Sequence, residues 1–172
     1  MSEEKSAQPV VFDVNVFVDA VVTGQDSFES WPSPPRASGH FAADCVGTIN
    51  DAVEFSLWLS PHVLTNIDRV LGAPAAKGGF EWETQLIEDY LDVLIEMAEA
   101  SGGGILEPDE AVTDCDDCKD NRIPELALAS RAVLIVSNDT DLLHMTPWRG
   151  TPVLSPRDFA SRVDAPRRAR RR

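Results

Sequence analysis

One carboxylate stands inside an otherwise apolar stretch near the start of the chain. Asp13 follows the apolar residues 10–12 and shortly precedes the apolar residues 16–18, so it is expected at the carboxyl end of a buried strand. An ionised carboxylate with apolar neighbours costs several kcal/mol unless it is hydrogen-bonded, paired with a cation or bound to a metal. Because no Lys or Arg lies between Lys5 and Arg36, we expect a metal ion or a distant segment to be its partner.

Further acids occupy comparable positions in the C-terminal half. Asp139 follows the apolar run 132–136, and Asp120 precedes the predicted helix 122–130. The carboxyl ends of parallel strands are where such sheets bind ligands. Carboxylates that converge there raise one another's pKa, and a hard cation such as Mg²⁺ or Mn²⁺ between them makes the arrangement favourable. Asp120 and Asp139 each also suit the N-cap position of a helix, which is the simpler interpretation of either residue alone.

Strand-like and helix-like segments alternate, which predicts a parallel sheet with helices on its faces. The predicted strands are 9–13, 54–59, 105–106, 132–136 and 152–154, and the predicted helices are 15–22, 42–51, 60–71, 80–100, 122–130, 142–145 and 156–163. In the long helix 80–100, Trp82, Leu86, Tyr90 and Met97 are spaced to share one apolar face, and Gly102-Gly103-Gly104 terminates it.

The segment 24–39 is rich in Gly, Ser and Pro and is predicted to be a long loop. Within it, Trp31 is the aromatic residue that suits stacking on a nucleic-acid base. Trp58, Trp82 and Tyr90 are most simply explained by the core or a partner interface.

Composition narrows the class of protein. The chain has 172 residues, of which 43% are hydrophobic, which suits one compact domain. No stretch approaches the roughly 20 apolar residues of a membrane span, and the polar, acidic start is unlike a secretory signal. The three cysteines do not form the even set of a secreted disulfide framework. We predict a cytoplasmic protein without membrane association.

Charge is distributed unevenly along the chain. The net charge is −14, yet five of the 15 basic side chains are arginines within the last six residues, and all 29 acidic side chains precede them. An acidic body argues against broad nucleic-acid binding through phosphate neutralisation alone and suits divalent cations or a basic partner protein. The basic end is most simply interpreted as a solvated tail, and contact with RNA phosphates is the alternative.

Five segments, in their order and spacing, resemble the PIN domain, a family of metal-dependent ribonucleases that includes the VapC-type toxins of toxin–antitoxin pairs. The segments are VVFDVNVFVDA at 10–20, LSPHVLTNIDRVL at 59–71, DDCKDNRIPELALAS at 116–130, VLIVSNDTDLL at 133–143 and VLSPRDFASRV at 153–163. The resemblance implies one domain over 9–163, a three-layer α/β/α sandwich around a central, mainly parallel sheet. Residues 1–8 and 164–172 are then flexible tails.

The resemblance also assigns roles to the acids. It implies that Asp13, Asp120 and Asp139 are the first, third and fourth metal carboxylates and carry catalysis. Asp117 and Asp141 become accessory metal acids.

Three uncharged residues complete the implied site. Asn15 is the polar companion of the first acid, and Ser137 takes the Thr/Ser position of the family. At the second acid, where the family commonly has Glu, this chain has Asn66, which can coordinate through its amide oxygen but adds no negative charge. Asp68 lies about 200° further around the helix and should face elsewhere.

The function implied is metal-dependent endonucleolytic cleavage of RNA with Mg²⁺ or Mn²⁺, in a toxin-like protein. RNA is then the substrate, and an antitoxin protein and a second copy of the chain (a homodimer) are candidate partners. Asn66 favours an alternative, a catalytically impaired PIN-fold module that binds RNA or protein. A phosphatase or nucleotide-binding protein of similar architecture is a third class, but the chain has no Gly-rich phosphate loop.

Two other motifs are weaker. Cys115 and Cys118 have the C-x-x-C spacing of zinc or redox sites, but no second pair in the sequence completes a tetrahedral set. Asp13-Val14-Asn15 resembles the D-x-D start of haloacid-dehalogenase phosphatases, where Asn in place of the second Asp removes the acid.

Overall fold

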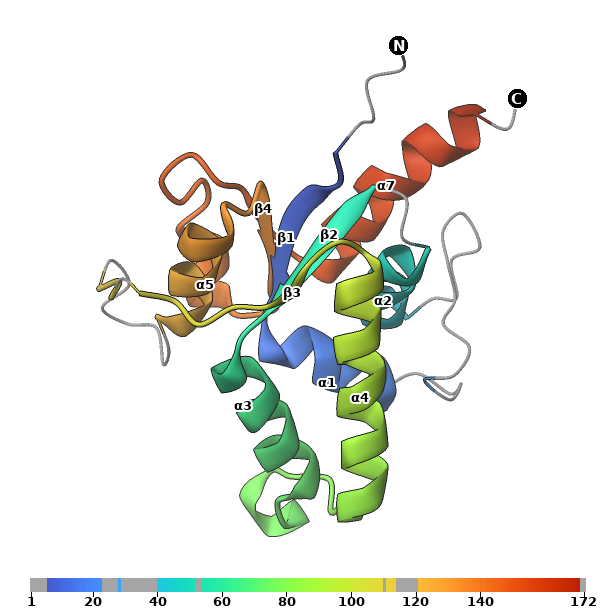
Figure 1. The fold of residues 1–172 in the computed structure, drawn as a ribbon, viewed down its shortest axis with the longest axis vertical. Coiled ribbons are helices and arrows are strands. Elements are labelled where there is room, and N and C mark those ends of the chain that lie inside the picture. The colour runs from blue at the N-terminus through green and yellow to red at the C-terminus, as the bar shows by residue number, and fades with distance from the viewer. Residues whose placement is uncertain are drawn as a thin grey trace.

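Five parallel strands form the centre of the fold (Figure 1). The computed structural model describes residues 6–22, 28, 40–51, 54–109, 111–113 and 121–170, with the backbone alone for 164–170. Within these residues the strands are β1 (Gln8–Phe12), β2 (Phe55–Leu59), β3 (Gly104–Ile105), β4 (Leu134–Val136) and β5 (Val153–Leu154). Their order in the sheet is β3-β2-β1-β4-β5.

This strand order places a change of direction beside β1. The chain adds β2 and β3 on one side of β1, and then returns to add β4 and β5 on the other side. Val11 of β1 is in register with Trp58 of β2 and with Ile135 of β4. Ligands of open α/β sheets bind where the strand order reverses, at the carboxyl ends of the strands, which here is the junction of β1 and β4.

Helices cover both faces of the sheet and extend past its carboxyl edge. The α-helices are α1 (Val14–Val22), α2 (Phe41–Asn50), α3 (Pro61–Gly72), α4 (Thr84–Ala100), α5 (Arg122–Ser130), α6 (Thr140–His144) and α7 (Pro156–Arg170). Figure 1 shows α5 on one face, against β1 and β2, and α2 and α4 on the other. The result is the three-layer α/β/α fold with α1 and α3 below the ends of the strands, as viewed in Figure 1.

The core forms where these layers meet. Val10, Val11 and Phe12 of β1 are fully buried, as a central parallel strand covered on both faces requires. The ring of Phe12 lies 5.5 Å from that of Phe159 of α7, between centroids. The buried Tyr90 of α4 donates a hydrogen bond from its hydroxyl to the carbonyl oxygen of Phe17 in α1, at 2.6 Å. This bond connects α4 to α1, the helix that follows Asp13.

Most predicted elements are present with ends that shift by no more than two residues, but α4 is shorter than predicted. It begins at Thr84 because Glu81 has a left-handed backbone (φ 54°) and the amide of Trp82 donates to the carbonyl oxygen of Leu71, at 2.9 Å. The predicted apolar face was also wrong at Leu86, which is 43% exposed. Ile87 is buried in its place.

The last helix ends later than predicted, and two predicted segments lie outside the described residues. Helix α7 continues to Arg170 instead of ending at residue 163, while the flexibility of the two tails stays a prediction. The predicted loop 24–39, apart from Phe28, and the acid-rich segment 114–120 lie outside the described residues. Trp31 and the C-x-x-C pair are therefore outside them too.

The connection from α4 to β3 passes unusually close to β2. A Cβ atom built on Gly103 would lie 1.8 Å from the carbonyl oxygen of Leu57. Ser101 fixes the same approach, because its hydroxyl accepts from the Leu57 amide at 2.9 Å and donates to the carbonyl oxygen of Ala98 at 2.6 Å. Of the three glycines predicted as a helix terminator, Gly103 therefore also lets the chain lie against the sheet.

Within the described residues, no helix has both the length and the apolar character needed to cross a membrane.

Candidate active site

Asp13 lies directly after β1, and hydrogen bonds from neighbouring and distant residues hold its carboxylate. Its Oδ1 accepts from the Val14 amide at 2.7 Å. Its Oδ2 accepts from the Ser137 hydroxyl at 2.7 Å and from the Asn15 amide group at 3.3 Å. The distant segment expected to support this carboxylate is therefore the one that follows β4.

Ser137 connects the two acid-bearing loops. Its side chain is fully buried, and its hydroxyl donates to Asp13 while accepting from the Asp139 amide at 2.9 Å. Asp139 in turn caps α6, since its Oδ1 accepts from the Asp141 amide at 2.9 Å. Capping and a place in the site are therefore compatible for Asp139.

A second bridge joins α1 to the same loop. Asn15 accepts from the Asn138 amide at 3.2 Å, and the side chain of Asn138 donates to Asp19 at 2.8 Å. Burial raises the pKa of the Asp19 carboxyl above its ordinary value, and the hydrogen bond from Asn138 opposes this shift. The loop after β4 is thus attached to α1 at two positions besides Asp13.

Asp19→Asn is expected to stabilise the fold slightly at neutral pH. A carboxyl whose pKa is higher in the folded chain binds more protons there, so its contribution to stability falls as the pH rises through the folded pKa. We expect the free energy of unfolding at pH 7 to rise by less than about 1 kcal/mol, because solvent screens this partly exposed group. Near pH 3, where the carboxyl is protonated in both states, the gain should vanish. Urea denaturation at both pH values measures the difference, and a loss of stability at pH 7 would contradict it.

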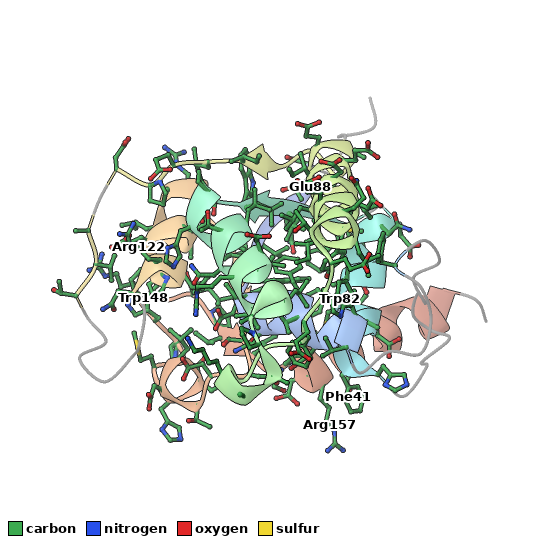
Figure 2. All side chains as sticks on the ribbon, turned by 90° about the horizontal axis from the view of Figure 1, so that it is seen from below. Phe41, Trp82, Glu88, Arg122, Trp148 and Arg157 are labelled. Carbon is green, nitrogen blue, oxygen red and sulfur yellow. The ribbon has the colours of Figure 1, made fainter. Side chains whose placement is uncertain are left out.

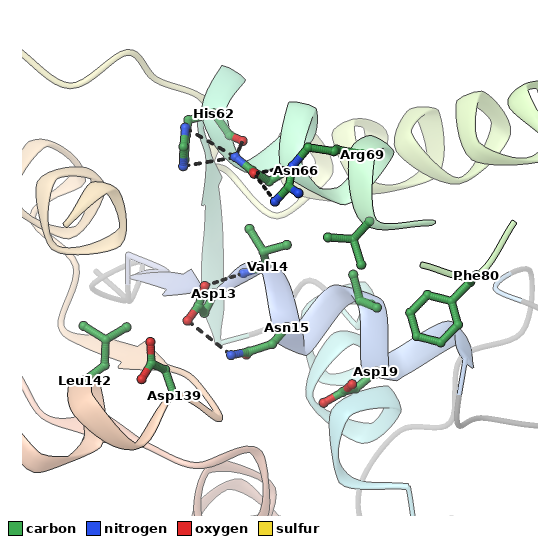
Figure 3. A pocket seen from close by; sticks show the side chains of 12 residues that line it. Asp13, Val14, Asn15, Asp19, His62, Asn66, Arg69, Phe80, Asp139 and Leu142 are labelled. Atoms are coloured by element: carbon green, nitrogen blue, oxygen red, sulfur yellow. Dashed lines mark hydrogen bonds between the residues drawn. The ribbon is translucent and has the colours of Figure 1, made fainter. Parts of the chain in front are cut away.

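Four of these residues, Asp13, Asn15, Asp19 and Asp139, line a pocket of about 640 Å³ at the carboxyl ends of β1 and β4. Figure 3 shows two sides to it. Asp13, Asn15, Asp19 and Asp139 lie on the side formed by α1 and the loop after β4, and α3 forms the opposite side. The remaining lining residues are Val14, Val18, His62, Asn66, Arg69, Val70, Phe80 and Leu142.

Four residues of α3, namely His62, Asn66, Arg69 and Val70, line this pocket because they are three or four positions apart, on one face of the helix. The Asn66 amide group donates to the carbonyl oxygen of His62 at 2.8 Å and lies 3.1 Å from its Nε2. The Asn66 Oδ1 accepts from Arg69 Nε at 3.3 Å and from an Nη at 3.1 Å. Helix α3 starts with Ser60 at its N-cap, which accepts from the Val63 amide.

The structure brings together part of the predicted site. Asp13, Asn15, Asn66 and Asp139 line one pocket, with Ser137 buried behind it. Two predicted metal acids, Asp117 and Asp120, lie outside the described residues.

The structure also shows where three other polar residues lie. Asp141 does not line the pocket; its amide supports Asp139 instead. Asp68 is exposed and also outside the lining, in agreement with its expected orientation. His62 also lines the pocket.

The sequence interpretation missed several lining residues. Asp19 follows Asn15 by four positions on α1, and His62 and Arg69 flank Asn66 at helical spacing, so periodicity carried a signal for all three. Phe80 had no such signal, because it enters the lining from the connection between α3 and α4.

The donor chemistry fits a hard divalent cation in part. Asp13 and Asp139 supply carboxylate oxygens, the ligands that Mg²⁺ and Mn²⁺ prefer. No donor among the described residues is hydrogen-bonded to the Asp139 Oδ2. Within the same residues, no group of three or more His, Cys, Asp or Glu side chains is arranged to hold a metal. The predicted Asp120 lies outside these residues.

The family follows from the sequence. The family model for the PIN domain matches residues 9–141, which is most of the chain, so the protein belongs to the PIN-domain family. Members of this family are generally nucleases. No curated protein matches the chain.

Proposed function

We propose that the protein is a metal-dependent endoribonuclease. The observation that carries this proposal is the convergence of Asp13 and Asp139, from loops after neighbouring parallel strands, on one pocket. Ser137 links the two loops through hydrogen bonds of 2.7 and 2.9 Å. A structural role alone does not require two carboxylates to line one pocket.

Each residue has a defined task in this proposal. Asp13 and Asp139, with the predicted Asp120, hold the cation, and the predicted Asp117 adds negative charge nearby. When bound, Mg²⁺ or Mn²⁺ supplies activation of water and charge neutralisation at the phosphate. Ser137 and Asn15 orient the Asp13 carboxylate.

The test is cleavage of a mixed pool of tRNA and structured RNA by the purified protein. Reactions contain Mg²⁺, Mn²⁺ or EDTA. We expect internal cuts with at least one metal and none with EDTA, because the cation both lowers the pKa of the attacking water and neutralises charge on the phosphate. Cleavage that persists in EDTA would contradict the metal-dependent mechanism.

A second candidate is a PIN-fold module that binds RNA without cutting it. The specific support is Asn66, whose amide oxygen accepts from the Arg69 guanidinium. An oxygen already bound to one cation is a weaker ligand for another, since the two positive charges repel. RNA binding without cleavage in either metal, by a folded protein, would favour this candidate.

The toxin-like role, the antitoxin partner, the homodimer and the cytoplasmic location stay predictions, as does the assignment of Asp141 as an accessory acid. They rest on the resemblance of five sequence segments and on composition. The hydrogen bonds of Asp13, Ser137 and Asp139 support the proposed chemistry of the pocket and do not test these predictions.

A further inference from the structure

The two sides of the pocket differ in charge. Asp13, Asp19 and Asp139 line one side, whereas α3 presents Arg69, an exposed side chain that is permanently cationic. In Figure 3 the Arg69 guanidinium lies beside Asn66, across from Asp13. Arg69 on the α3 side therefore attracts an anionic ligand that enters the pocket.

The Arg69 guanidinium is oriented by hydrogen bonds to Asn66 and keeps further N–H donors for a ligand. Two of its nitrogens donate to the Asn66 Oδ1, at 3.3 and 3.1 Å, and Asn66 is itself anchored to the His62 carbonyl oxygen. A guanidinium has five N–H donors in a planar fork that matches phosphate. The contact with Asn66 thus orients the group and leaves donors for a ligand.

Phe80 provides an aromatic surface in the same pocket. Its side chain is 42% exposed although it is large and apolar. Figure 3 shows the ring at the end of the pocket away from Leu142 and Asp139, and Val18 and Val70 add apolar lining. An exposed aromatic ring near a cationic group is the combination that single-stranded nucleic-acid sites use, with bases stacked on the ring and phosphates on the cation.

We propose that Arg69 and Phe80 form a nucleotide subsite next to the reacting phosphodiester. An unpaired base stacks on Phe80, and the phosphate beside it is bound by Arg69. This inference rests on the proposed function for the class of ligand, RNA. It adds that the strand must be single in this part of the pocket, because the faces of a base inside a duplex are already covered by its neighbours.

The chain offers a matched control pair outside the pocket. Phe41 is 41% exposed, and the Arg157 guanidinium lies 5.8 Å from the centre of its ring. Figure 2 shows the two side chains together at the edge of the molecule, and neither lines the pocket. They reproduce the exposure and chemistry of Phe80 and Arg69 at another place.

The experiment measures binding of a fluorescein-labelled single-stranded RNA by fluorescence anisotropy. Ca²⁺ replaces Mg²⁺, and a gel confirms that the RNA stays intact. We expect Phe80→Leu and Arg69→Ala each to raise Kd about tenfold, with little change for Phe41→Leu and Arg157→Ala. The same RNA annealed to its complement should bind the wild-type protein more weakly.

Salt dependence separates the two roles. Arg69→Ala should reduce the slope of log affinity against log salt by about 0.7, the value for one phosphate contact on a single strand. Arg69→Lys should keep the slope, because it keeps the charge. Phe80→Leu should lower affinity without changing the slope, and Phe80→Trp should restore affinity. A loss of fold, monitored by circular dichroism, would not produce this pattern.

The outcomes distinguish the subsite from the nuclease. If the wild-type protein cuts RNA but the Phe80 and Arg69 variants bind as it does, the subsite is overturned and the nuclease stands. If these variants bind weakly as expected while the wild-type protein cuts nothing, the subsite is supported within a binding module. Equal weakening by the Phe41 and Arg157 variants, or no binding of single-stranded RNA by the wild-type protein, overturns the subsite.

Discussion

Asp13→Asn is expected to lower RNA cleavage by roughly a hundredfold or more, the scale on which removal of one electrostatic contact acts in an enzyme site. The substitution removes one negative charge from the centre of the pocket and keeps the size of the side chain. Its amide oxygen can still accept from Val14 or Ser137, which now contact the carboxylate at 2.7 Å. The fold should therefore survive while metal binding and cleavage fail. Initial rates with Mn²⁺ and Mg²⁺, beside a thermal unfolding curve, measure both effects.

Asp68→Asn is the matched control for this variant. It makes the same chemical change on α3, at an exposed residue that does not line the pocket. Cleavage by the control should equal that of the wild-type protein. If Asp13→Asn cuts RNA at the wild-type rate, Asp13 does not hold a catalytic cation. If both variants lose activity together, the effect reflects overall charge rather than the site.

Gly103→Ala is expected to destabilise the fold by about 3 kcal/mol or more, a loss in the range of severe core substitutions. The new methyl carbon would lie 1.8 Å from the Leu57 carbonyl oxygen and 2.6 Å from its carbon. Leu57 belongs to the buried strand β2, so it cannot move aside without disturbing the sheet. Urea denaturation gives the change in the free energy of unfolding.

Gly78→Ala controls for the general cost of losing a glycine. Gly78 has a φ of +78° and open space where a Cβ would stand. Only backbone strain opposes alanine there, at a cost of about 1–2 kcal/mol. The Gly103 variant should therefore be clearly less stable than the Gly78 variant. Similar losses for both would mean that the contact with Leu57 relaxes easily.

Sequence reasoning succeeded where a local pattern and the tertiary structure agree. The apolar runs that become β1 and β4 end at Asp13 and Ser137, so parallel pairing alone predicts that these ends meet. It failed at the start of α4, because the amide of Trp82 is bound to α3 and the apolar pattern of 80–83 carries no sign of that contact. Tertiary contacts commonly decide such boundaries.

The chemistry of the pocket was predictable on one side and not on the other. Carboxylates at strand ends are visible as charges that interrupt apolar runs, which is why Asp13 and Asp139 could be selected. The α3 side depends on which groups Asn66 contacts, and the binding of its oxygen by Arg69 is a matter of side-chain conformation. The identity of Asn66 alone was equally compatible with a metal ligand.

The hydrogen bond between Ser137 and Asp13 joins residues separated by 124 positions, and this has a consequence for the newly made protein. While a ribosome is still synthesising β4, the first carboxylate is present but its partner loop does not yet exist. In the proposed ribonuclease, the site therefore cannot assemble until synthesis has passed Asp139 and β4 has paired with β1. The order of the strands thus delays assembly of the site until β4 and the loop after it have been made.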